Sequence, residues 1–127
     1  MSRHDPAVTL RQIAEAAEKA RAICEGKTLV ALIADWQATL AFERVLEIVG
    51  EAVKRLPEEL REKYPAVPWR FVAGMRDRLS HGYDDFRHEV LWATAPRVLP
   101  VLLETVAQIL HALDAWACKR TVPWDGG

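Results

Sequence analysis

The sequence predicts an all-α protein, folded as an up-and-down bundle of four to five helices. Apolar residues recur at intervals of three and four along most of the 127 residues, and this is the spacing of one helix face. Capping residues and helix-ending residues flank these stretches. No stretch alternates apolar and polar residues in the way that a half-buried strand does.

The first predicted helix begins at Asp5-Pro6. An aspartate caps the first turn, and proline has no N–H to lose there. Its apolar face consists of Leu10, Ile13, Ala17, Ala20 and Ile23. Gly26 ends this helix. Residues 28–34 fit a separate short helix, with Asp35 capping the helix that follows.

The clearest apolar stripe lies in residues 36–56. It is formed by Phe42, Val45, Leu46, Val49, Ala52, Val53 and Leu56. Charged residues lie mostly on the opposite face, among them Glu43, Glu47, Glu51, Lys54 and Arg55. One stripe opposite a charged face predicts a helix that packs on the core. A short surface helix is predicted over residues 57–63.

The second half of the chain predicts three further helical stretches. One runs from Trp69 to about Ser80 and ends before Gly82, and another extends through Trp92 after the caps Asp84-Asp85. Pro96 marks a restart, because proline disrupts a helix interior. In the final helix, residues 98–103 are apolar nearly all round, which favours a contact with a second subunit. We expect one domain over residues 1–117 and a frayed tail over 118–127.

Charge and composition narrow the classes of function. The net charge is −1, so RNA binding would need a local basic patch. Cys24 and Cys118 form no C-x-x-C pair, and we interpret them as reduced thiols. The amino terminus lacks the apolar stretch of a signal peptide, and the run Leu29–Ala34 is too short to span a bilayer. We therefore expect a cytoplasmic protein without a membrane contact.

The candidate chemistry lies in residues 74–83, where Arg76, His81 and Tyr83 form an R-x4-H-x-Y pattern. Cations in the last turns of a helix also stabilise its negative end, so the pattern is open to a capping explanation. The chemical interpretation is RNA cleavage without a metal. Histidine exchanges protons near neutral pH, and arginine binds phosphate.

Helix geometry limits how these groups can meet. Five residues place Arg76 and His81 about 140° apart on an ideal helix. They converge only if the helix unwinds before Gly82, or if two subunits bring their copies together. A metal site could be assembled from His81, Asp84, Asp85, His88 and Glu89. Its spacing matches no closed zinc pattern, so we expect no metal and no cofactor.

Four segments together resemble the HepT-like HEPN proteins: residues 46–52, 67–70, 74–83 and 89–92, in matching order and spacing. The resemblance covers roughly residues 5–113. It implies a HEPN-type bundle that forms a homodimer or a higher oligomer, with a composite, metal-independent endoribonuclease site at the dimer interface. Arg76 and His81 would be catalytic and Asp77 supporting. Asp77 and Asp84 depart from the residues that many relatives carry there.

The resemblance also implies a toxin–antitoxin pair. The partner would be an MntA-like nucleotidyltransferase antitoxin that transfers AMP to Tyr83, and the substrate would be an RNA such as tRNA or mRNA. An AMP group two residues from His81 adds negative charge and bulk, which would repel RNA phosphate. The alternative hypothesis is a non-catalytic HEPN module that docks a nucleotidyltransferase, with Arg76 and His81 in structural roles.

Overall fold

The computed structural model describes residues 5–75, 77 and 85–121, and within the last helix it describes the side chains of residues 88–116. Every regular element in these ranges is a helix, which confirms the all-α class. Three helices are long: α1 (Pro6–Cys24), α3 (Trp36–Lys54) and α7 (Asp85–Thr121). Three are short: α2 (Leu29–Ala34), α4 (Glu58–Glu62) and α5 (Trp69–Ala73).

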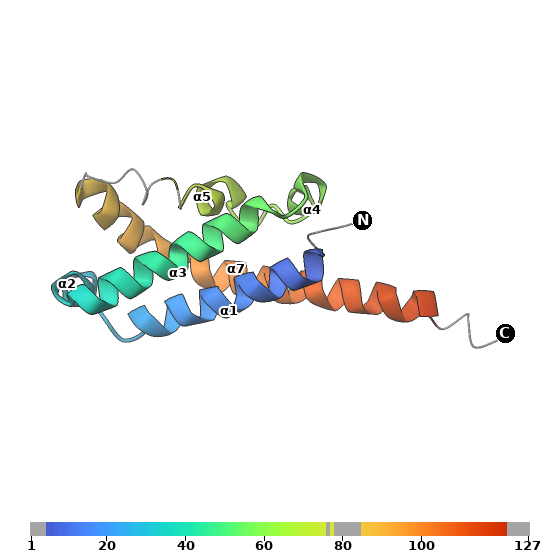
Figure 1. The fold of residues 1–127 in the computed structure, drawn as a ribbon, viewed down its shortest axis with the longest axis horizontal. Coiled ribbons are helices and arrows are strands. Elements are labelled where there is room, and N and C mark those ends of the chain that lie inside the picture. Colours follow the sequence, from blue (N-terminus) through green and yellow to red (C-terminus); the bar gives the residue numbers. More distant parts are fainter. Residues whose placement is uncertain (1–4, 76, 78–84, 122–127) are drawn as a thin grey trace.

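The three long helices form the body of the bundle. Helix α1 packs against both α3 and α7, and α5 packs on α3. Figure 1 shows α1 running opposite to α3 and α7, with α4 and α5 beside the C-terminal half of α3. This arrangement agrees with the predicted up-and-down bundle.

The predicted helix ends are confirmed where local capping decides them. The Asp5 side chain accepts a hydrogen bond from the Ala7 N–H at 3.0 Å, and the Asp35 side chain accepts one from the Ala38 N–H at 3.0 Å. Thr28 caps α2 through the Ala31 N–H at 3.1 Å. Gly26 follows α1 with a φ of 75°, a conformation that glycine adopts without strain. Each cap satisfies backbone groups that the helix itself leaves unpaired.

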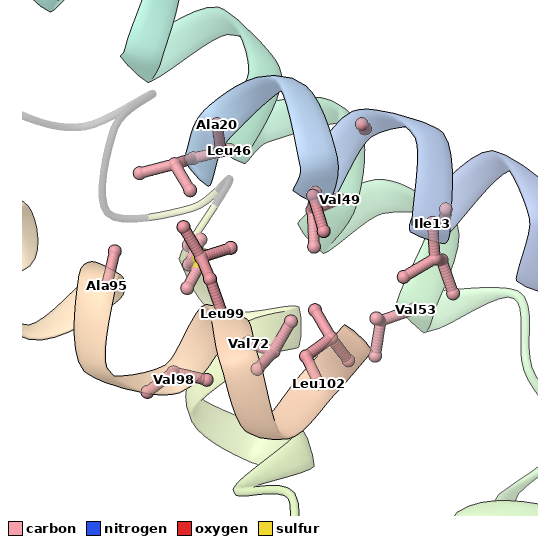
Figure 2. Packing of buried hydrophobic residues seen from close by; sticks show 14 of the residues in the cluster. Ile13, Ala20, Leu46, Val49, Val53, Val72, Ala95, Val98, Leu99 and Leu102 are labelled. Atoms are coloured by element: carbon pink, nitrogen blue, oxygen red, sulfur yellow. The ribbon is translucent and has the colours of Figure 1, made fainter. Parts of the chain in front are cut away.

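The core contains the stripes that the sequence predicts. In α1 the buried residues include Leu10, Ile13, Ala17 and Ala20. All seven residues of the stripe predicted over residues 36–56 are buried as well, and the last of them lies just beyond the end of α3: Phe42, Val45, Leu46, Val49, Ala52, Val53 and Leu56. In the view of Figure 2, Leu102 of α7 lies between Val72 of α5 and Val53 of α3, and all three belong to the buried cluster. One continuous cluster therefore joins the long helices and α5.

Helix α7 corrects the prediction of a break at Pro96. Pro96 and Pro100 both lie inside one continuous helix of 37 residues. An interior proline costs about 3 kcal/mol, whereas full burial of one leucine contributes roughly 1.5–3 kcal/mol. The two prolines therefore cost about 6 kcal/mol together. Five large apolar side chains of α7 are at most 1% exposed, namely Leu91, Leu99, Leu102, Val106 and Ile109. Their burial contributes roughly 7.5–15 kcal/mol, which outweighs that cost. Figure 1 shows that the first turns of α7 run at an angle to the rest, as interior prolines produce.

The ends of two other predicted stretches also differ. The helix expected over residues 69–80 is interrupted, because α5 ends at Ala73 with Gly74 as its C-cap; Met75 and Asp77 are helical again. Residues 78–84 lie outside the described residues. At the carboxyl end, α7 reaches Thr121, four residues into the expected tail.

By length and hydropathy alone, the segment His88–Trp116 of α7 could cross a membrane. The core helix of a bundle passes the same test, and α7 buries Ala95, Leu99, Leu102, Val106 and Ile109 in the core. We therefore assign this segment to the bundle. Val101 and Leu103 are only partly buried, and the predicted contact of this face with a second subunit stays a prediction.

Candidate active site

Asp77 is the one predicted site residue that lies within the described residues. Arg76, His81 and Tyr83 lie outside them. The described residues nearest to the rest of the motif are Asp77, at its start, and those from His88 onward, after its end. We call these two places the first and the second flank. Both flanks contact α3.

On the first flank, Lys54 at the C-terminal end of α3 binds Asp77. Its Nζ lies 3.1 Å from Oδ1 and 3.3 Å from Oδ2 of the carboxylate. The two side chains are 36% and 56% exposed, so water screens the pair and it contributes at most about 1 kcal/mol to stability. The family resemblance implies a supporting role for Asp77, and the structure adds Lys54 as its partner, a residue that was expected on the charged outer face of α3.

On the second flank, His88 in the first turns of α7 pairs with Glu43 of α3. The distance between Nδ1 and the Glu43 carboxylate oxygen Oε2 is 2.9 Å, and the side chains are 18% and 19% exposed. Glu43 was predicted to lie on the charged face of α3 that points away from the core, so its contact with His88 was not predicted. No local signal could have revealed it, because the two residues are 45 positions apart.

The environment of His88 orients its ring. The His88 ring meets the Trp92 ring edge-on, with centroids 5.8 Å apart and planes at 76°. A carboxylate only accepts hydrogen bonds, so Nδ1 donates this one to the ionised Glu43 side chain. Within the described part of the chain, Nε2 is buried and has no hydrogen-bond partner. An oriented histidine therefore lies at the exit of the motif.

The two contacts attach both flanks of the motif to one helix. Glu43 and Lys54 are eleven positions apart on α3, which corresponds to about 16 Å along the axis. Asp77 and His88 are held at these two points. The intact α3 helix therefore sets where the motif enters and leaves the bundle.

The alternative metal set is represented in the described side chains by His88 and Glu89. His88 contacts Glu43. Over the described side chains, no cluster of three or more His, Cys, Asp or Glu residues is arranged to hold a metal ion. His81, Asp84 and the side chain of Asp85 lie outside this range.

Comparison with known proteins places this bundle and motif in a class. The model of the family described as "Ribonuclease HepT-like" matches residues 13–109, a range that includes Arg76, Asp77, His81 and Tyr83. The chain belongs to the HepT-like ribonuclease family, and the resemblance inferred from its motifs is confirmed.

Three relatives illustrate the similarity. A candidate RNase of Caldanaerobacter subterraneus is 49% identical over 73 residues, which is 58% of this chain and 65% of the relative. A candidate RNase of Methanocaldococcus jannaschii is 41% identical over 71 residues, 56% of this chain and 61% of the relative. Both matches span less than two thirds of the relative's length.

The third relative, from Thermococcus cleftensis, is named a probable ribonuclease HepT. It is 37% identical over 93 residues, which is 73% of this chain and 84% of the relative. No solved structure significantly matches the chain. The family assignment therefore rests on sequence, and the helical architecture described above agrees with it.

Proposed function

We propose that this protein is a metal-independent endoribonuclease of the HepT type, acting as the toxin of a toxin–antitoxin pair in the cytoplasm. Arg76 binds and orients the phosphate, His81 transfers protons, and Asp77 supports this group. The observation that carries the proposal is the R-x4-H-x-Y motif inside the matched family region. The attachment of both its flanks to α3 supports it further.

The activity is tested by incubating the purified protein with tRNA, and with mRNA, in the presence of EDTA. We expect cleavage by the wild type and its loss in Arg76→Ala and His81→Ala. His111→Ala is a matched control, because His111 is an exposed histidine of α7. Cleavage that survives in His81→Ala, or that requires an added metal ion, would contradict this assignment.

We further propose that the site is composite and forms in a homodimer. The support is geometric: Arg76 and His81 project about 140° apart on an ideal helix, so copies from two subunits meet more readily. Exposed apolar side chains offer surface for such a contact, with Val30, Trp36 and Leu40 at 77%, 67% and 58% exposure. Val30 lies on α2, and Trp36 and Leu40 lie in the first turns of α3, so the three come from consecutive helices.

Complementation tests the composite site. When Arg76→Ala and His81→Ala chains are mixed and allowed to exchange, each mixed dimer contains one site with both functional groups. We expect the mixture to recover a substantial part of the activity that each variant alone lacks. A mixture as inactive as its components, or a wild type that sediments only as a monomer, would exclude the composite site.

Regulation by AMP transfer to Tyr83 is the remaining part of the proposal. A partner nucleotidyltransferase of the MntA type would attach AMP, and the added negative charge would repel RNA phosphate. Incubation with such a partner and ATP is expected to add the mass of one AMP group to the wild type and none to Tyr83→Phe. Tyr64→Phe is a matched control, and an unmodified wild type would refute this role.

A non-catalytic interaction module is the second candidate, favoured by the same exposed apolar side chains of α2 and α3. Under this alternative Arg76 and His81 are structural. It predicts that Arg76→Ala and His81→Ala lower the melting temperature and weaken binding of a nucleotidyltransferase. Variants that keep the wild-type melting temperature and lose only RNA cleavage would exclude it.

A further inference from the structure

A cleft lies between the end of α3, α4 and α5, directly beside Asp77. Its volume is about 780 Å³, within the range of roughly 300–1,000 Å³ that ligand sites occupy. Its lining includes Lys54, Arg61, Arg70, Glu58 and Glu62 together with Asp77. The cleft therefore joins an element of the R-x4-H motif to a set of charged groups that the proposed cleavage step does not use.

The cationic groups come from three separate helices. Lys54 belongs to α3, Arg61 to α4 and Arg70 to α5. Lys54 binds Asp77. The exposed Arg70 side chain has no ion-pair partner among the residues that the structure describes. Arg70 is therefore available to an anion in the cleft.

Arg61 adds an independent indication. Its Nε is buried and lacks a hydrogen-bond partner within the described part of the chain. A buried donor without a partner is costly, so the Arg61 side chain gains a hydrogen bond when it turns toward an acceptor in the cleft that it lines. A phosphate oxygen is such an acceptor, and arginine binds it through two N–H groups.

The acidic groups narrow the class of ligand. Three basic and three acidic side chains line the cleft, so net charge alone does not attract a simple anion. A nucleotide unit suits both kinds of group, because its phosphate accepts hydrogen bonds and the amino groups of its base donate them to carboxylates. Glu58 and Glu62 are four positions apart, and thus lie on one face of α4.

We propose that this cleft is a strand-binding subsite, which holds a nucleotide of single-stranded RNA next to the one being cleaved. The inference rests on the proposed ribonuclease function and adds where the flanking substrate lies. The guanidinium groups of Arg61 and Arg70 contact its phosphate. The carboxylates of α4 accept hydrogen bonds from the base of this nucleotide, so the subsite favours bases that carry an exocyclic amino group.

The test measures binding of a fluorescent 12-nucleotide oligo(C) RNA to the full chain carrying His81→Ala, so that the RNA stays intact. Arg70→Gln in this background is expected to raise Kd about two- to fivefold, the range of an exposed ion pair. The slope of log Kd against log salt should fall by about 0.7, the value of one phosphate contact on a single strand. Arg11→Gln is the matched control, since Arg11 is an exposed arginine on α1, and it should change neither quantity.

A second variant tests the α4 wall. Glu58→Gln is expected to weaken binding of oligo(C) and to leave oligo(U), which lacks the amino group, nearly unaffected. If the carboxylates only repel RNA, the same variant will tighten binding of both oligonucleotides, which would overturn the assignment of this wall. Circular dichroism melting confirms that each variant is folded.

The experiments distinguish a wrong subsite from a wrong nuclease site. If Arg70→Gln and Arg11→Gln are indistinguishable in Kd and salt slope while the wild type cleaves RNA through His81, the subsite is wrong and the ribonuclease stands. If RNA binds at the cleft but its cleavage does not depend on His81, the proposed nuclease site is wrong. A salt slope that falls by about 0.7 in Arg70→Gln and stays unchanged in Arg11→Gln supports the subsite.

Discussion

The pair formed by Glu43 and His88 should stabilise the bundle by a measurable amount. The two residues connect α3 to the first turns of α7 through a contact of 2.9 Å between largely buried side chains. A hydrogen bond to a charged group contributes about 1.5–3 kcal/mol, and partial exposure reduces this value. We therefore expect Glu43→Ala to lower the free energy of unfolding by about 1–2 kcal/mol.

His88→Ala should cost more, because it also removes the edge-on contact with Trp92, and such ring pairs contribute about 0.5–1.5 kcal/mol. The double variant isolates the pair itself. We expect a coupling energy of about 1 kcal/mol, within the range of roughly 0.5–3 kcal/mol for residues in contact. Glu43→Gln, which retains an oxygen acceptor, should lose less than Glu43→Ala.

Urea unfolding followed by circular dichroism provides the four free energies of the cycle. The experiment is repeated at several protein concentrations, because association would make stability depend on concentration. Glu15→Ala, which removes an exposed glutamate of α1, is the control and should change stability by less than about 0.5 kcal/mol. A coupling energy indistinguishable from zero would refute the role assigned to this contact.

Three further predictions follow from burial and exposure. Lys54→Gln should lower the free energy of unfolding, measured in urea, by less than about 1 kcal/mol, because the ion pair of Lys54 with Asp77 is exposed to water. A measured loss above about 2 kcal/mol would contradict this expectation. Leu99→Ala should cost about 2–5 kcal/mol through the cavity left in the core, whereas Val8, at 49% exposure on α1, should be replaceable by alanine with little loss; equal losses would contradict the core assignment. Burial raises the pKa of the Cys24 thiol, so folded-state stability falls as pH rises through that raised pKa. In a variant with Cys118 replaced by serine, the pH midpoint for alkylation of Cys24 should be higher in the folded protein than in urea. Equal midpoints would refute the effect of burial on this thiol.

Much of the bundle was predictable because its signals are local. Asp5, Thr28 and Asp35 cap helices through residues two or three positions away, and the stripes of α1 and α3 follow from helical periodicity. The motif of Arg76 and His81 was equally visible, since it depends on residue order. The sequence therefore sufficed for the class of fold, the family and the candidate chemistry.

Long-range packing decided the rest. Lys54 and Asp77 are 23 positions apart, and Glu43 and His88 are 45 apart, so neither pair leaves a periodic or capping signal. The continuity of α7 through Pro96 likewise depends on the burial of its apolar face against the other helices. Local propensity describes the cost of a proline in a helix, but only the assembled core supplies the free energy that offsets it.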